Sequence, residues 1–122
     1  MVPFANSINK EGDDVIKAIA GYLTKQTKAN HNNIDSDLAE QGKTLFAERG
    51  CTACHGEDAK TPIMDEYPKL AGLSPKYIEI QLKAFRAGTR TGTEFSSMMA
   101  PMASTLSEED SVAVANYLGS LQ

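Results

Sequence analysis

The pentapeptide Cys51-Thr52-Ala53-Cys54-His55 is the feature that most constrains how this chain of 122 residues can fold. It uses both cysteines of the chain and one of its two histidines. Two thiols three positions apart on one helical turn can each bond a vinyl-derived carbon on the same edge of a porphyrin, and the adjacent imidazole can then ligate iron. The spacing therefore predicts one haem c, attached covalently through Cys51 and Cys54, with His55 as an axial ligand.

Three other kinds of site use the same residue types. A thioredoxin-like dithiol sits near a βαβ pattern, and no alternating strand pattern is visible in this sequence. A structural zinc site needs four ligands, and only the distant His31 could be added to the three residues of the motif. A disulfide within the motif would close a tiny loop and gain little entropy. Haem attachment is the favoured interpretation, and zinc or dithiol chemistry remains the alternative.

Composition narrows the classes of partner. The chain has no tryptophan, four tyrosines and four phenylalanines, so a large apolar prosthetic group would fill volume that aromatic side chains otherwise occupy. The formal net charge of −4 argues against nucleic acid as a partner. No run approaches the roughly 20 apolar residues of a membrane span. No leader sequence is recognisable, although covalent haem attachment points to the bacterial periplasm, so we expect a periplasmic protein whose leader is absent from this chain.

The two ends of the chain resemble each other. Residues 1–9 align with residues 99–107, with methionine, proline and alanine at the same offsets. Each copy continues through an acidic cluster into an apolar segment that ends in a tyrosine-leucine pair, Tyr22-Leu23 and Tyr117-Leu118. The simplest interpretation is that residues 1–30 are the tail of a preceding haem domain and residues 31–122 a complete monohaem domain. Chance similarity between two amphipathic helices is the alternative.

Apolar periodicity and capping residues predict four helices. The first follows Asp13 and Asp14, and the second spans residues 35–49 and is ended by a glycine. The third spans residues 74–88 and the fourth begins after Ser107. No strand is expected, so the fold class is all-α.

In combination, several motifs resemble the class I c-type cytochromes, most closely the repeat unit of the tandem dihaem branch. The resemblance covers residues 35–122, and it implies the class I cytochrome c fold, here with an extra N-terminal helix. In chain order the motifs are Gly42-x-x-x-Phe46, Cys51-Thr52-Ala53-Cys54-His55-Gly56, Tyr67-Pro68-Lys69-Leu70-Ala71-Gly72, Tyr77 through Arg86 with Gln81, and the methionine segment before Leu106-Ser107.

A methionine thioether is the expected sixth ligand of the iron, and three candidates lie close together: Met98, Met99 and Met102. Met99 is preferred because the resembling repeat units carry their ligand seven residues before this leucine-serine pair. The repeat within the chain agrees, since Met1 aligns with Met99 while Phe4, which cannot ligate iron, aligns with Met102. Met102 is the second candidate.

Further cofactor-binding residues are implied by the resemblance. The carbonyl of Pro68 is expected to accept the proton of the second imidazole nitrogen of His55. Candidate donors to the haem propionates are Tyr77, Gln81, Lys83 and Arg86, of which Lys83 is expected to lie on the surface. Leu70 and Ile78 are expected to contact the porphyrin face.

Histidine and methionine ligands on opposite sides leave iron no open position for a substrate. The sequence therefore predicts single-electron transfer, as a soluble carrier or a haem domain of a larger redox protein, and no enzymatic activity of its own. The expected partners are a redox donor and a redox acceptor protein, with a homodimer through the N-terminal helix as a further expectation. The alternative function is a peroxidase or small-ligand sensor with labile methionine ligation.

Overall fold

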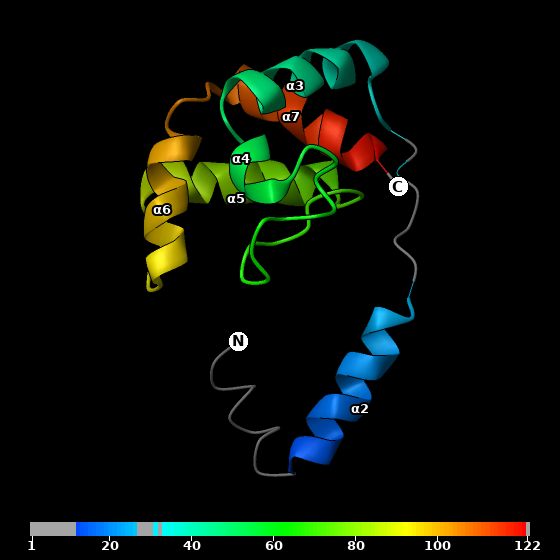
Figure 1. The fold of residues 1–122 in the computed structure, drawn as a ribbon. Helices are drawn as coiled ribbons and strands as arrows, with labels where there is room; N and C mark the ends of the chain where they lie inside the picture. The colour runs from blue at the N-terminus through cyan, green and yellow to red at the C-terminus, as the bar shows by residue number, and fades with distance from the viewer. Residues whose placement is uncertain (1–11, 27–30, 32, 122) are drawn as a thin grey trace.

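The computed structural model describes residues 12–26, 31 and 33–121. In chain order its helices are α2 (Asp13–Thr24), α3 (Ser36–Glu48), α4 (Thr52–His55), α5 (Pro75–Ala87), α6 (Glu94–Ala103) and α7 (Glu108–Ser120) (Figure 1). The expected all-α class is confirmed, and the described part of the chain contains no strand. The methionine motif within residues 1–9 lies outside the described residues.

The capping residues fix the helix ends as the sequence predicts. The carboxylate of Asp35 accepts hydrogen bonds from two backbone amides in the first turn of α3. Ser74 caps α5, and Gly88, with φ 72°, closes it in the left-handed conformation that glycine adopts at low cost. Ser107 and Asp110 form a reciprocal capping box at the start of α7.

The methionine segment forms a helix that the sequence analysis did not predict. Thr93 and Ser96 build a capping box at the start of α6, although neither residue carries the acidic group that usually marks such a box. Pro101 lies inside the helix, where proline normally argues against helical structure. The helix nevertheless places Met99 one turn before Ala103, which is completely buried.

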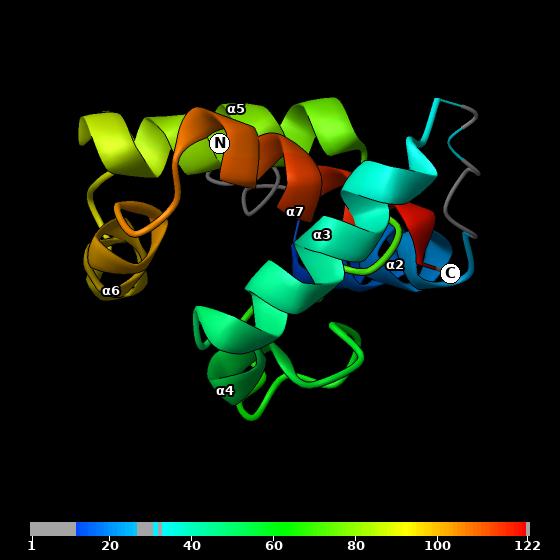
Figure 2. The same cartoon turned by 90° about the horizontal axis from the view of Figure 1, so that it is seen from above.

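The crossing of α3 and α7 is the most extensive helix contact in the described structure, and Figure 2 shows α3 lying across α7. A Cβ atom added at Gly42 would collide with the backbone carbonyl of Ala113 and would lie 2.9 Å from the Cβ of Tyr117. One turn further along α3, the ring of Phe46 contacts Tyr117 with the ring centroids 5.6 Å apart. The glycine is therefore what allows the two helices to approach so closely.

The apolar core lies where α7 packs on α3 and α5, with α6 against α5. Its buried members are Phe46, Ala59, Ala71, Ile78, Leu82, Phe85, Ala103, Leu106, Val114, Ala115 and Leu118. No helix in the described part of the chain is both long enough and apolar enough to cross a bilayer.

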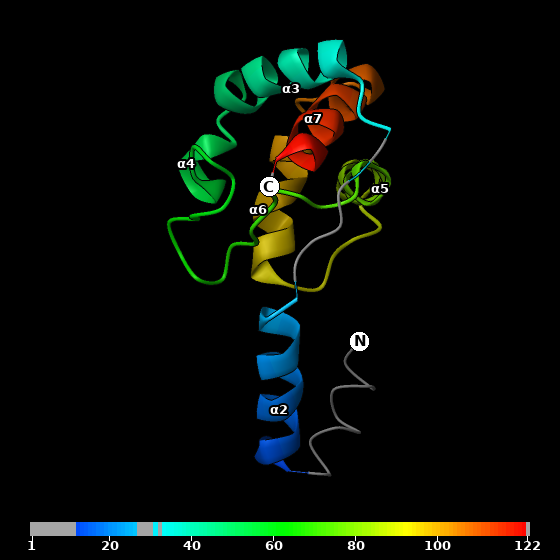
Figure 3. The same ribbon diagram turned by 90° about the vertical axis from the view of Figure 1, so that its right-hand side faces the viewer.

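Helix α2 lies apart from the other helices (Figures 1 and 3). It has no buried residue. Its apolar side chains are exposed instead, with Tyr22 at 65% and Leu23 at 61% of full accessibility. An amphipathic helix of this kind is normally stabilised by a partner for its apolar face.

Candidate haem site

The cysteine-histidine motif forms one helical turn shortly after α3, from which it is separated by a change of direction at Gly50, where φ is 78°. The amide of Cys51 donates to the carbonyl of Phe46 at 3.2 Å, and the amide of His55 donates to the carbonyl of Cys51 at 3.0 Å. Gly56 follows the turn with φ 85°, and a Cβ atom there would overlap the carbonyl group of Thr61. The turn is therefore held between the end of α3 and the loop that follows it.

The imidazole of His55 is buried, with 8% of its surface exposed. Its Nδ1 lies 3.0 Å from the carbonyl oxygen of Pro68. Because a carbonyl only accepts, Nδ1 carries the proton in this hydrogen bond and Nε2 is left with its lone pair. Among the described residues Nε2 has no hydrogen-bond partner. This tautomer and its fixed ring orientation are what an axial ligand requires.

Both cysteines are free thiols and half-buried. Burial is the largest cause that raises the pKa of Cys51, a backbone hydrogen bond opposes it, and the neighbouring Cys54 raises it slightly further. Neither sulfur is in a disulfide in the described structure. The Nε2 of His31 lies 3.0 Å from the carbonyl oxygen of Gly72, so it is not placed to complete a zinc site with the two cysteines. In the described part of the chain no three His, Cys, Asp or Glu side chains are grouped to hold a metal ion.

The loop after α4 brings Pro68 under His55. The carbonyl of Ala59 accepts hydrogen bonds from the amides of Leu70 at 2.8 Å and Ala71 at 3.1 Å, which closes the base of the loop. Near its start, the carboxylate of Asp58 accepts from the amides of Lys60 and Thr61. These hydrogen bonds, with that from Lys60 the largest, lower the pKa of Asp58 below its ordinary value.

A series of aromatic ring contacts joins this loop to α6. The ring of Tyr67 lies 6.5 Å from the His55 ring and 5.8 Å from the ring of Phe95, which it meets edge to face. Phe95 is the second residue of α6. The N-terminal end of the methionine helix is therefore linked through Tyr67 to the histidine.

The three methionines differ in burial. Met99 is half-buried and packs against the apolar core, as Cys51 does. Met98 is 47% exposed and Met102 38% exposed. The methyl carbon of Met102 lies 3.7 Å from the position that a Cβ at Gly50 would take, next to the attachment motif.

The remaining candidate cofactor-binding residues differ in how far they are buried. Ile78 is buried in the core, and Leu70 packs against it while half-buried. Tyr77 is 50% exposed in the first turn of α5. The side-chain carbonyl of Gln81 accepts a hydrogen bond of 2.8 Å from Arg90, and Lys83 is exposed, as expected. The structure thus groups the core-facing candidates with the attachment motif, while on α5 Tyr77 is exposed and Gln81 is half-buried.

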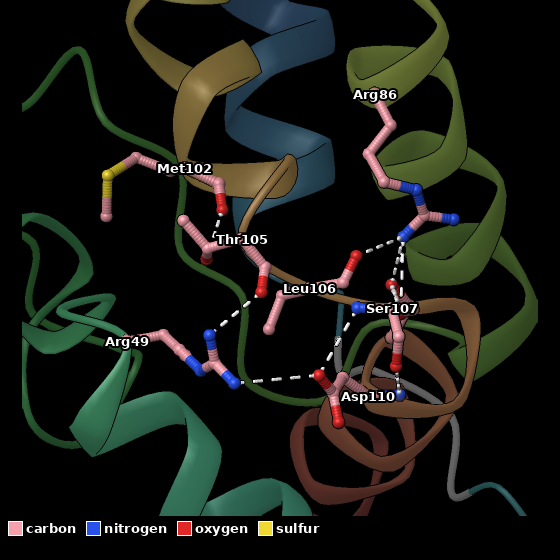
Figure 4. Close-up of polar contacts among 8 residues, drawn as sticks. Arg49, Arg86, Met102, Thr105, Leu106, Ser107 and Asp110 are labelled. Carbon is pink, nitrogen blue, oxygen red and sulfur yellow. Dashed lines mark hydrogen bonds and ion pairs between the residues drawn. The ribbon is translucent and has the colours of Figure 1, made fainter.

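Two arginines bind the connection between α6 and α7 from different sides (Figure 4). The guanidinium of Arg86, on α5, donates to the carbonyls of Leu106 and Ser107 and to the hydroxyl of Ser111. Arg49, at the end of α3, donates to the carbonyl of Thr105. No sequence pattern singles out Arg49, because its partner is 56 residues away in the chain.

The donors present fit a covalently attached haem c: two free thiols, a buried imidazole with one nitrogen unpaired in the described structure, and a thioether-rich helix. The family model for cytochrome c matches residues 39–122. Cytochrome c4 of Azotobacter vinelandii is 32% identical over 118 residues, which cover 89% of this chain and 55% of that protein. Cytochrome c-554(547) of Halothiobacillus neapolitanus is 40% identical over 91 residues, covering 69% of this chain and 97% of that protein.

The reduced cytochrome c4 of Pseudomonas stutzeri is a similar solved structure, with a TM-score of 0.72, 32% identity, and coverage of 85% of this chain and 58% of that one. This chain therefore spans little more than half the length of the cytochromes c4 that it matches. The similarity supports electron transfer by a c-type haem. Because the family model spans most of the chain and the fold is shared with solved relatives, this chain belongs to the cytochrome c family, in its class I branch.

Proposed function

We propose that this chain transfers single electrons through one haem c, which Cys51 and Cys54 would attach and His55 would ligate. The observation that carries the proposal is the hydrogen bond between His55 and Pro68, since it leaves only Nε2 of a buried imidazole free to bind metal. When bound, the haem supplies a one-electron redox couple. The protein's residues contribute the attachment, the ligand orientation and a surrounding that excludes water.

We propose Met99 as the second axial ligand. Its partial burial against the same core that contacts Cys51 supports this choice, whereas Met98 and Met102 are more exposed. A thioether ligand favours the reduced state and leaves no position for a substrate, which agrees with electron transfer rather than with peroxidase or sensor chemistry.

Mass spectrometry and visible spectra of the purified protein test both proposals. Covalent attachment predicts a mass that exceeds the polypeptide by one haem after denaturation. Methionine ligation predicts the weak far-red charge-transfer band of the ferric protein, which should be lost in Met99→Leu. The matched control Met98→Leu should keep it. A denatured mass equal to that of the bare polypeptide would refute haem attachment, and a band lost only in Met102→Leu would reassign the ligand.

The partners proposed are redox proteins that give and take one electron, and the proposed compartment is the periplasm. A relative described as thiosulfate dehydrogenase electron acceptor, from Stutzerimonas stutzeri, is 38% identical over 78 residues of this chain. Its description supports a partner of the redox-enzyme class.

We also propose that residues 1–30 belong to a preceding haem domain and that residues 31–122 form the haem domain proper. When Tyr22-Leu23 is aligned with Tyr117-Leu118, Ala18 aligns with Ala113, the residue that crosses Gly42 on α3. Helix α2 thus repeats the contact face of α7, but in the described structure this face is exposed. The crossing site on α3 is already occupied by α7, so a second copy of this chain offers no equivalent place for α2.

Hydrogen exchange distinguishes this arrangement from a homodimer through α2. The domain proposal predicts weak protection of the α2 amides at every protein concentration, because an isolated helix of 12 residues is marginally stable. Protection that grows with concentration, together with a dimer in sedimentation velocity, would favour the homodimer instead.

A further inference from the structure

The two segments that carry the proposed ligands have few direct contacts with each other. His55 follows α3 closely, whereas Met99 lies on α6, which packs mainly on α5. Neither α3 nor α4 forms an extensive helix contact with α6 among the described helices. The separation between the segments therefore depends on individual side chains.

Arg49 is one such side chain. It follows the last residue of α3 and precedes Cys51 by two positions. Its Nη1 donates a hydrogen bond of 2.9 Å to the carbonyl oxygen of Thr105, and its Nη2 lies 3.8 Å from Oδ2 of Asp110. One guanidinium thus joins the attachment motif to the connection after α6 (Figure 4).

Thr105 transmits this link to the methionine helix. Its hydroxyl donates to the carbonyl of Met102 at 2.8 Å, and its amide donates to the same oxygen at 3.2 Å. Thr105 is therefore fixed against the last turn of α6, and Arg49 binds a residue two positions beyond the end of this helix. Figure 4 shows the side chain of Met102 extending away from Arg86, and its methyl carbon lies near Gly50, the residue after Arg49.

Arg86 has a different role on the same connection. It reaches the connection from α5, and its strongest partners are at the start of α7, with the Ser111 hydroxyl at 2.5 Å. It therefore joins α5 to α7 and does not contact the attachment motif. Of the two arginines, only Arg49 links the cysteine-histidine turn to the methionine helix.

We propose that Arg49 is a positioning residue that holds the C-terminal end of α6 at a fixed place relative to the cysteine-histidine turn, and so keeps the methionine ligand bound. The proposal rests on the proposed haem function. Loss of the guanidinium is expected to increase the fraction of protein without the methionine ligand by about threefold to tenfold, since a charged hydrogen bond on an exposed side chain is worth less than a buried one.

The experiment compares Arg49→Gln, Arg49→Lys and the control Arg90→Gln in the haem-loaded protein. Arg90→Gln removes the same charge, but in the described part of the chain the guanidinium of Arg90 interacts with Gln81 and the ring of Phe85. Two midpoints are followed in denaturant: loss of the ferric far-red band, which reports methionine ligation, and loss of far-ultraviolet circular dichroism, which reports global unfolding. The expected result is that both Arg49 variants lose the band well before they unfold, whereas Arg90→Gln behaves like the wild type.

The lysine variant separates position from charge. Lysine keeps the positive charge but lacks the planar fork that reaches Thr105 and Asp110 together, so the proposal requires it to lose the band early as well. Band loss in Arg49→Gln alone would assign the effect to charge, and coincident shifts of both midpoints would assign Arg49 a purely structural role; either result overturns the proposal.

A second variant keeps the test informative should the Arg49 variants fail to accumulate. Thr105→Val removes the hydroxyl that donates to Met102 and leaves the backbone carbonyl bound by Arg49 in place. It should show the same early band loss in weaker form, and an unchanged band would contradict the proposed link. Absence of the far-red band in the wild-type protein is a separate outcome, because it refutes methionine ligation itself.

Discussion

A single added methyl group at Gly42 would meet the backbone of α7. The added Cβ has no rotamer freedom and it collides with a main-chain carbonyl, that of Ala113, so no rotamer change can relieve the collision. Gly42→Ala is therefore expected to lower the free energy of unfolding by about 3 kcal/mol in denaturant titration. Gly21→Ala is the matched control, because nothing lies within 4 Å of its Cβ position, and it should leave the transition unchanged.

The carboxylate of Asp58 gives the loop below the haem site a pH dependence. Hydrogen bonds from Lys60 and Thr61 lower its pKa from the ordinary 3.8, so its stabilising contribution is present above that value and is lost as the pH falls through the lower folded-state value. The difference in unfolding free energy between wild type and Asp58→Asn should therefore be largest near neutral pH and should vanish in strong acid. Urea titrations across this range measure it.

Asp65→Asn is the control for this prediction. Asp65 is exposed in the same loop and forms no hydrogen bond in the described structure, so its replacement should change stability little at any pH. A difference for Asp58→Asn that grows toward acid would contradict the assigned direction of the shift.

At the residue scale, contacts between residues close in the sequence could be predicted, whereas a contact between residues far apart in the sequence could not. The pairing of His55 with Pro68 was expected from the family resemblance, and the described structure contains that hydrogen bond. Arg49 was missed because nothing in its neighbourhood indicates an acceptor 56 residues away. A side chain whose partner is fixed only by tertiary packing leaves no pattern in a single sequence.

At the scale of elements, the side chain of Asn116 connects α7 to the start of α3 by a hydrogen bond. Its side-chain oxygen accepts from the amide of Asp35, the capping residue of α3, at 2.9 Å, and its amide group donates to Val112 at 2.9 Å. Asn116→Ala should cost about 2 kcal/mol of unfolding free energy, because it leaves the amide of Asp35 without its acceptor. Calorimetry or urea unfolding tests this.

Ser120→Ala provides the comparison for Asn116. The hydroxyl of Ser120 is exposed and bonds only within its own helix, so its removal should change the unfolding free energy by less than about 0.5 kcal/mol. Equal effects of the two substitutions would show that Asn116 does not join the helices.

The elements differ in how well the sequence predicted them. The helices α3 and α5 carry strong capping residues and begin and end as expected, and α7 begins as expected after Ser107. Helix α6 was missed because Pro101 and an uncharged capping box argue locally against a helix, while packing against α5 stabilises it. Tertiary contact outweighs local preference there.

For the whole molecule, the separation of α2 from the remaining helices leads to a direct prediction. Leu23→Ala changes a helix with no buried residue at a position 61% exposed, so the unfolding free energy should change by less than about 0.5 kcal/mol. Leu118→Ala, at a position 2% exposed in the core, should cost about 3 kcal/mol in the same assay. A large loss for Leu23→Ala would mean that α2 supports the haem domain.

The closed base of the loop at Ala59 has a consequence for how this molecule can vary. The carbonyl of Ala59 accepts from the amides of both Leu70 and Ala71, so the segment between Ala59 and Leu70 is a loop whose two ends are held together. Its outer turn, at residues 64–66, is exposed. The entropic cost of closing a loop grows only slowly with its length, so extra residues at that turn should leave the hydrogen bonds to Ala59 in place. The surface that this loop presents to other proteins can therefore change in sequence and length, while the hydrogen-bonded base of the loop next to His55 keeps its structure.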